Sequence, residues 1–339
     1  MSSATSVIPA SSSPRSSLGT VVGIVLLIAL ALVPLLASTD PFVVTLFSRI
    51  LVFAIAAVSL NLILGYGGLV SFGHALYLGL GVYSASILSF HGIDNGWIQL
   101  LVTLVVCCLI GLLTGAIVLR TTGIAFIMIT LAFAQMFYFL FVSLSQYGGD
   151  DGMRLASGSK FSGIDLAQAN TLYWVAFVIL CVSLYGTQRV IHSRFGVVLR
   201  ASKSNDRRMK ALGFPTFRYR LAAYVMSAAL CGVAGLLFAN LTEFASPSYM
   251  SWTTSGELIV MVMLGGLGTL FGPLVGSLAM ILTEEGLKML TQHWMVIFGP
   301  LIVLVVTVSR QGIIGVLHIV QDRHAQRSVR PDHPVREQP

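Results

Sequence analysis

Charged side chains are scarce in this sequence. Of its 339 residues, 10% are Asp, Glu, Lys or Arg and 56% are apolar, whereas about 25% of the residues of a soluble globular protein are charged. Apolar runs of about 20 residues, the length that crosses the hydrocarbon core of a bilayer, follow one another along most of the chain. The composition excludes an ordinary soluble domain and predicts an all-α polytopic membrane protein surrounded by membrane lipid.

Motifs of catalysis and cofactor binding are missing as well. The chain contains no G-x-x-x-x-G-K-[ST] phosphate-binding loop, no H-E-x-x-H and no G-x-S-x-G, so neither ATP hydrolysis nor another enzymatic activity is predicted. Its four cysteines lie in apolar segments without metal-ligand spacing, which favours small buried thiols over a disulfide or a metal site. We expect no cofactor. The net charge of +7 gathers in one loop and the C-terminal tail, a pattern that does not predict nucleic-acid binding.

Hydropathy predicts eight to ten membrane spans, at about 18–38, 42–64, 68–90, 97–119, 122–143, 171–189, 219–242, 256–270, 272–290 and 294–308. Residues 1–17 are rich in Ser and Pro and are expected to form a disordered cytosolic tail. Residues 18–308 form the membrane domain, and 309–339 a basic cytosolic tail. The eighth and ninth spans are short and rich in glycine, so residues 256–290 are either two spans or one span plus a re-entrant segment.

Positive charge and span parity agree on the orientation of the chain. Lys and Arg in short loops stay on the cytoplasmic side. If the N-terminus is inside, six spans return the chain to the cytoplasm at Arg189, and four more return it at Arg310. Both termini are therefore predicted to be cytoplasmic. The predicted outer loops hold most of the acids, namely Asp40, Asp94, Asp150, Asp151, Asp165, Glu243 and Glu257.

The densest positive charge lies in residues 189–220, which hold nine of the twenty Lys and Arg residues and a single acid, Asp206. A solvated loop explains this charge but not the helix signals within it. The sequence predicts a short cytosolic helix near 204–212. Its signals, in chain order, are Ser204 as N-cap, Asp206 in the first turn, Lys210 in the last turn, Gly213 after the helix and Pro215 as a stop.

Glycine clusters interrupt two of the predicted spans. Residues 65–74 read GYGGLVSFGH, and a looser repeat, GGLGTLFG, occupies residues 265–272. Broken backbone at membrane depth occurs where it is buried in protein or lines a cavity. Two such segments in the two halves of a chain indicate a duplicated architecture and a central pathway. The residues predicted to line that pathway are Asn61, Gly65, Gly67, Gly68, Ser71, His74, Gln135, Gly265, Gly266 and Gly268.

Structural roles compete with this interpretation. Asn61, Gln135 and Asn240 are equally suited to hydrogen bonds between helices, and a lone histidine such as His74 is more often a packing residue than a ligand contact. The small-residue motifs at Gly111 and Gly115 and at Gly272 and Gly276 predict close helix packing. Ionisable residues within spans are functional candidates by default. Those found here lie near the outer ends of two predicted spans and are Arg49, Glu284, Glu285 and Lys288, of which Glu284 and Lys288 are spaced to pair on one helix face.

Six stretches, taken together and in order, resemble the LivM-type permeases of branched-chain amino-acid ABC importers. They are LNLILGYGGLVSFGHA at 60–75, RTTG at 120–123, LAFAQ at 131–135, GGDDG at 148–152, SRFG at 193–196 and LGGLGTLFGP at 264–273. The resemblance extends from about Leu46 to Leu317. It implies a permease subunit in the plasma (inner) membrane of a bacterium, which pairs with a second, related permease. Two cytoplasmic ATP-binding subunits and a periplasmic or extracellular solute-binding protein would complete the importer.

The resemblance also implies residue roles. The loop 190–218 would carry the helix that docks on the ATPase, and the loops near 91–97, 144–170 and 243–256 would receive the solute-binding protein. This sequence departs from the family in having Asp206 where Glu is commoner, and in the bulky Met209. The implied coupling residues are Arg200, Ser204, Asp206, Arg207, Arg208, Ala211, Leu212 and Gly213.

Two alternatives remain open at this point. A related permease for another small solute, such as urea or a short amide, would share the same motifs. A stand-alone secondary transporter or channel would not need partner subunits. The uncharged span centres disfavour an ion-coupled carrier, because such carriers usually keep an acidic residue near the midplane to bind the coupling ion.

Overall fold

A computed structural model describes residues 17–36, 40–161, 163–293, 295–300 and 303. Apart from Ser17, the predicted N-terminal tail lies outside the described residues, as do the predicted C-terminal tail and much of the predicted tenth span. The expectations for those segments therefore stay predictions.

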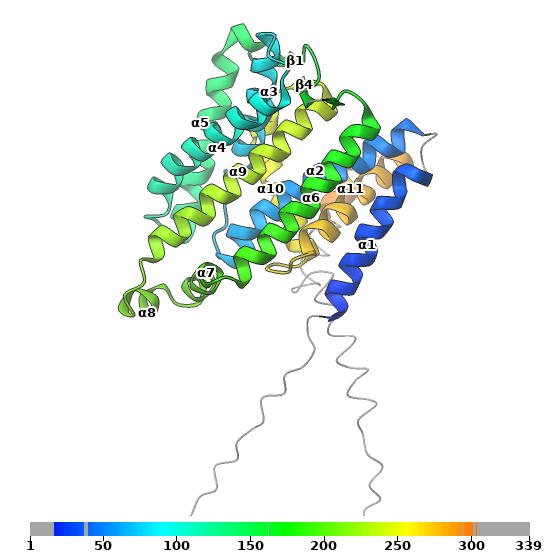
Figure 1. Ribbon diagram of the computed structural model, residues 1–339. Helices are drawn as coiled ribbons and strands as arrows, with labels where there is room; N and C mark the ends of the chain where they lie inside the picture. The colour runs from blue at the N-terminus through cyan, green and yellow to red at the C-terminus, as the bar shows by residue number, and fades with distance from the viewer. Residues whose placement is uncertain (1–16, 37–39, 162, 294, 301–302, 304–339) are drawn as a thin grey trace, which may run out of the picture.

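Helices make up most of the described chain. They are α1 (Ser17–Leu36), α2 (Pro41–Asn61) with a π-helical extension (Leu62–Tyr66), α3 (His74–Phe90), α4 (Gly96–Val118), α5 (Ile124–Ser143), α6 (Ala169–His192), α7 (Arg194–Ser204), α8 (Asp206–Ala211), α9 (Thr216–Thr242), α10 (Trp252–Gly265) and α11 (Gly272–Leu290), with short 3-10 turns at Ser145–Tyr147 and Pro247–Met250. Figure 1 shows the long helices in a tilted bundle, with α7 and α8 at one end and β1 and β4 at the other.

Among the described residues, five helices are long and apolar enough to cross a membrane: α2 with its extension, α4, α5, α6 and α9. Residues 21–35 of α1, α3 and α10 are shorter apolar helices. α11 has 19 residues but carries three charged side chains in its second half. The described residues thus form a helical protein with several membrane-spanning helices. They do not confirm the predicted number of ten spans.

Glycine lets the central helices α3 and α9 approach closely. A Cβ atom added at Gly235 of α9 would overlap the carbonyl oxygen of Leu78 in α3, and one added at Gly81 of α3 would overlap the carbonyl oxygen of Gly232. Because backbone lies on the far side of each contact, a side chain at these positions has no space. This pair of helices packs with α2 and α4 into the most buried part of the molecule.

Both predicted small-residue motifs lie at helix contacts. An added Cβ at Gly111 would lie 2.9 Å from the Cβ of Ala228, and one at Gly115 would lie 2.9 Å from a ring carbon of Tyr224, so α4 packs on α9 through these glycines. Gly276 of α11 lies against the backbone of Met261 in α10. The prediction of close helix packing at these motifs is confirmed.

α10 and α11 form a short antiparallel hairpin. Gly265 lies against Gly272, and Gly276 lies against Met261. Residues equally far from the connection therefore contact each other, as expected of an antiparallel pair. The 14 residues of α10 extend only about 21 Å at 1.5 Å per residue, less than the ~30 Å of a hydrocarbon core. This length disfavours the interpretation of residues 256–290 as two full membrane spans.

The three predicted outer loops meet at the end of the bundle opposite α7 and α8 (Figure 1). β1 (Met153–Arg154) pairs antiparallel with β4 (Phe244–Ala245), and β2 (Lys160–Phe161) with β3 (Ile164–Asp165). The amide of Lys160 donates to the carbonyl of Asp94 at 2.8 Å. Asn240 fastens this layer to α9, because its side chain exchanges two hydrogen bonds with Ser159. One expectation is wrong: Glu257 lies within α10, not in an outer loop.

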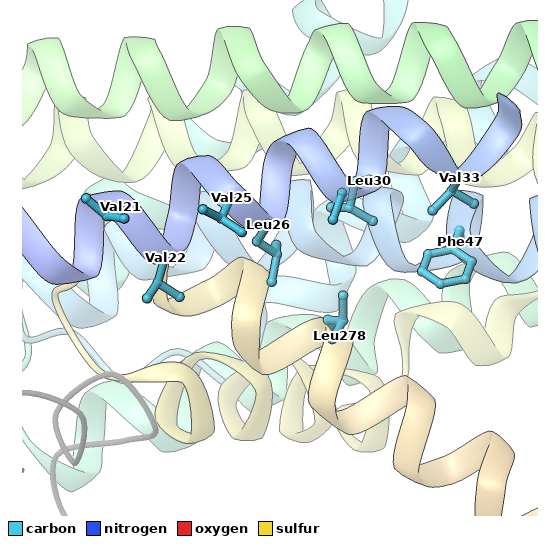
Figure 2. A pocket seen from close by; sticks show the side chains of 9 residues that line it. Val21, Val22, Val25, Leu26, Leu30, Val33, Phe47 and Leu278 are labelled. Carbon is cyan, nitrogen blue, oxygen red and sulfur yellow. The ribbon is translucent and has the colours of Figure 1, made fainter. Parts of the chain in front are cut away.

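α1 lies against α2 and α11 across an apolar hollow of about 470 Å³. Figure 2 shows valine and leucine side chains of α1 facing Phe47 of α2 and Leu278 of α11. Its lining has no charged or hydrogen-bonding side chain. Such a surface suits the hydrocarbon interior of the bilayer and offers nothing that would hold the charged groups of an amino acid.

The close approach of α3 and α9 makes a prediction about stability. Gly235→Val forces a side chain against the Leu78 carbonyl, and overpacking of this kind costs about 1–3 kcal/mol. We expect the unfolding temperature of the purified protein in detergent to fall by several degrees, measured by tryptophan fluorescence. Gly186→Val is the matched control, because no atom lies within 4 Å of a Cβ at that position of α6. Equal unfolding temperatures for the two variants would contradict this packing.

Candidate functional site

Two helix breaks lie where the sequence predicts them. The first helix break, residues 67–73, separates the π-helical end of α2 from α3. The second helix break, residues 266–271, separates α10 from α11. Gly68, Gly266 and Gly268 have positive φ angles of 71°, 120° and 72°, a region that residues with a side chain rarely enter. The glycines are thus required by the backbone path.

Asn61 joins the two breaks. Its Nδ2 donates to the carbonyl oxygen of Thr269 at 2.9 Å, and its Oδ1 accepts from the amide of Gly268 at 3.1 Å. The side chain is only 1% exposed, so both bonds are sheltered from water. A Cβ on Gly65 would overlap Asn61 Oδ1 and lie 2.6 Å from the amide nitrogen of Gly268. Gly65 must therefore be glycine for the two segments to meet.

Side chains from neighbouring helices satisfy other backbone groups around the first break. Thr130 of α5 accepts from the amide of Phe72 at 3.2 Å, and Ser255 of α10 accepts from the amide of Ala75, at the start of α3, at 3.0 Å. An irregular segment inside a membrane protein needs such partners, because lipid supplies none. Side chains from α5 and α10 thus pair two of the backbone donors at this break within the protein.

The other predicted pathway residues fall into separate places. Ser71 and His74 are fully buried, and His74 Nε2 lies 2.8 Å from Ser59 Oγ, in line with a packing role for this histidine. Gly67 and Gly68 line a cavity of about 220 Å³. Gln135 is half-buried on α5, and no hydrogen bond links it to this group within the described part of the chain. The structure brings Asn61, Gly65 and Gly268 into one cluster and places the other residues apart from it. That these residues line a pathway stays a prediction.

Charged residues near the opposite end of α2 and α11 pair with one another. Lys288 Nζ lies 2.7 Å from Glu284 Oε1, as their spacing predicts, and 3.6 Å from Glu285 Oε2. Arg49 of α2 reaches the same Glu284 carboxylate at 3.6 Å. These contacts tie α11 to α2.

The basic loop contains two helices where one was expected. α7 ends at Ser204, and α8 begins at Asp206. Ser204 is therefore not the N-cap. That role belongs to Asn205, which has an extended backbone (φ −154°, ψ 95°) and whose Oδ1 accepts from the amide of Arg208 at 3.0 Å. Asparagine competes with serine for this position, and the sequence alone did not separate them.

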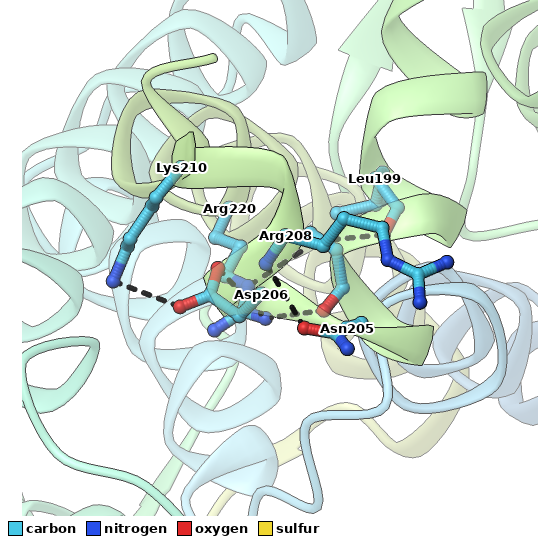
Figure 3. Close-up of polar contacts among 7 residues, drawn as sticks. Leu199, Asn205, Asp206, Arg208, Lys210 and Arg220 are labelled. Carbon is cyan, nitrogen blue, oxygen red and sulfur yellow. Dashed lines mark hydrogen bonds and ion pairs between the residues drawn. The ribbon is translucent and has the colours of Figure 1, made fainter. Parts of the chain in front are cut away.

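Asp206 forms a joint between α8 and α9. Its carboxylate pairs with Lys210 at 2.8 Å and with Arg220 of α9 at 3.4 Å (Figure 3). Arg220 also donates to the carbonyl oxygen of Ser202 in α7 at 2.8 Å. Burial by itself would raise the pKa of Asp206, but hydrogen bonds from Lys210 and Thr216 and the positive charge of Arg220 hold that pKa below its ordinary value. The carboxylate is ionised at neutral pH, and the joint weakens only when acid protonates it.

The far end of α8 agrees with the prediction. Gly213 has a φ of 85°, and the amide of Phe214 returns to the carbonyl of Met209 at 3.1 Å, which closes the helix. Met209 is buried, whereas Leu212 is 66% exposed. The exposed residues of α8 and of the segment after it are Arg207, Arg208, Lys210, Ala211, Leu212, Gly213, Phe214 and Pro215.

Arg200 has a different position from that expected of a docking residue. It lies in α7, where its guanidinium donates to the carbonyl oxygens of Ile191 and Gly196 at 3.3 and 3.4 Å. It therefore holds the turn between α6 and α7. Two functional candidates were missed by sequence reasoning: Arg220, described above, and Lys203, whose Nζ donates to the carbonyl oxygen of Gly65 at 2.7 Å. Both counted only as positive charge in the sequence, and no pattern there shows their partners.

Comparison with known proteins places this chain in a family of transport proteins. The family described as "branched-chain amino acid transport system / permease component" matches residues 42–306. The chain is 24% identical to the high-affinity branched-chain amino acid transport system permease protein LivM of Salmonella typhimurium and to that of Escherichia coli, over 78% of this chain and 68% of each relative. It is 23% identical to the corresponding protein LivH of Escherichia coli, over 78% of this chain and 91% of the relative. No solved structure matches.

The match includes both helix breaks and the α7–α8 region. Of the helices next to the breaks, α2 with its extension is long and apolar enough to cross a membrane, whereas α3 and α10 are shorter apolar helices. The chain belongs to the family of permease components of branched-chain amino acid transport systems.

Proposed function

We propose that this chain is a transmembrane permease subunit of an ATP-driven importer for branched-chain amino acids (Leu, Ile and Val), located in the plasma membrane. The observation that carries the proposal is the family match over residues 42–306. The names of the relatives supply the substrate class. The chain forms part of the translocation path and has no hydrolytic role of its own. Its partners are a second related permease, two cytoplasmic ATP-binding subunits and a solute-binding protein outside.

α8 is the element that docks on an ATP-binding subunit. It combines an exposed Leu212 with exposed Arg207 and Arg208, a surface suited to a groove with an apolar floor and an acidic rim. The Asp206–Arg220 ion pair ties α8 to α9, which packs against the central helices α2, α3 and α4. A displacement of α8 is thereby passed to the core of the bundle.

The opposite end of the molecule receives the solute-binding protein. The loops at 91–97, 144–170 and 243–256 are joined there by β1–β4 pairing and by the Lys160–Asp94 hydrogen bond. Both termini are cytoplasmic in this proposal, as predicted from charge, and the chain has ten membrane segments. α10 and α11 enter from the outer end as a hairpin whose tip, the second helix break, meets the first.

A reconstitution tests this function. Proteoliposomes would contain this chain with the second permease and ATP-binding subunits encoded beside it, and the neighbouring binding protein would be added outside. We expect uptake of labelled leucine that requires ATP and the binding protein, and that excess isoleucine or valine suppresses. Transport by this chain alone, driven by an ion gradient, would overturn the importer assignment. Uptake of urea or acetamide without leucine uptake would overturn the substrate.

The docking role of α8 makes a second prediction. Asp206→Asn with Leu212→Ala removes the ion pairs that hold α8 and its exposed apolar contact. We expect leucine uptake to fall at least about tenfold, which corresponds to the loss of about 1.4 kcal/mol of docking free energy, with the amount of protein in the membrane unchanged.

The matched control is Asp40→Asn with Leu109→Ala, which removes one exposed carboxylate outside the three loops assigned to the solute-binding protein and one exposed leucine (54% exposed) away from α8. Normal uptake by the Asp206 and Leu212 double variant, or an equal loss in the control, would refute the coupling role.

A further inference from the structure

Lys203 links the cytosolic helices to the first helix break. It lies one residue before the end of α7, and its ammonium group donates to the carbonyl oxygen of Gly65 at 2.7 Å. Gly65 belongs to the π-helical end of α2. A single hydrogen bond therefore connects the loop that carries α8 with the backbone where α2 stops.

The Gly65 carbonyl needs a partner from outside its own helix. The last carbonyl groups of any helix have no amide ahead of them. Here the amide of Gly68 is used by Leu64 at 3.1 Å, and that of Leu69 by Ile63 at 2.9 Å. A cation at a helix C-terminus also complements the helix dipole. The ammonium group of Lys203 meets both requirements.

The absence of a side chain at Gly68 leaves space for Lys203 to reach Gly65. A Cβ added at Gly68 would lie 2.8 Å from Cγ of Lys203, so the lysine stem crosses the space that a side chain there would fill. The positive φ of Gly68, 71°, independently favours glycine. Gly68 is thus required both by the backbone conformation and by the space that the side chain of Lys203 occupies.

The backbone next to Lys203 is held by the contacts between α8 and α9 described above. Arg220 bonds the carbonyl of Ser202, the preceding residue, and pairs with Asp206 of α8. From α8 the contacts run in sequence through Asp206, Arg220 and Lys203 to Gly65, whose backbone lies against Gly268 of the second break.

We propose that Lys203 is the positioning residue that transmits movement of α8 to the paired helix breaks. The inference rests on the proposed function. When α8 moves with the ATP-binding subunit, the end of α7 moves with it and Lys203 releases or repositions the Gly65 carbonyl. The cavity of about 220 Å³ beside Lys203, bordered by Gly67, Gly68, Val70 and Arg220, gives the side chain room for this motion.

Three variants in the complete reconstituted importer test the role. Lys203→Met keeps the apolar stem and removes the ammonium group. We expect ATP hydrolysis to persist while leucine transported per ATP falls at least about fivefold, the lower range of coupling between two sites. Lys203→Arg restores most of the ratio, because a guanidinium also donates to a carbonyl. Arg194→Gln, at the other end of α7, removes the same charge and is expected to leave the ratio unchanged.

Hydrogen–deuterium exchange on the same complexes provides a readout that needs no substrate. We expect Lys203→Met to speed exchange of the amides in residues 65–73, with the amides of α4 unaffected. An unchanged transport ratio with unchanged exchange would overturn the proposal, as would an equal loss in Arg194→Gln. If the wild-type complex imports no branched-chain amino acid, the proposed function fails, while exchange still decides whether Lys203 holds the break.

Discussion

Interrupted helices inside a bilayer depend on one constraint: every freed backbone group needs a partner within the protein. In this chain the side chain of Asn61 satisfies it across two breaks, by bonding the amide of Gly268 and the carbonyl of Thr269. Thr130 and Ser255 supply further partners from α5 and α10. Because these bonds come from separate elements, the breaks and the helices around them hold one another in place.

In the proposed importer, the same arrangement would let a subunit without a phosphate-binding loop use energy from ATP. Leu212 is exposed, and α8 is tied by Asp206 and Arg220 to the central helix α9. Lys203 extends that tie to Gly65. The work would then be delivered as displacement of backbone and not as chemistry within this chain. The path itself needs little affinity for a small zwitterion, since specificity would reside in the solute-binding protein.

Local sequence signals predicted local features well. Glycine content located both breaks, the Gly111 and Gly276 contacts followed from residue spacing, and Gly213 marked the end of α8. The sequence did not predict contacts between residues far apart along the chain. Asn61 and Gly268 are 207 positions apart, and Lys203 and Gly65 are 138 positions apart. A side chain with several possible partners does not reveal the one that the fold selects. The division of the basic loop at Asn205 was missed for a local reason, because Ser204 and Asn205 are both good N-cap residues.

The most direct test of the account is a distance within the assembled importer. Spin labels would replace Leu267, in the second helix break, and Leu109, on α4, both of which are exposed, in a chain whose four native cysteines are changed to serine. The account predicts that ATP binding shifts the distance between the labels by about 2 Å or more, the scale of helix displacements in switching proteins. Identical distance distributions with and without ATP, in a complex that transports leucine, would contradict it.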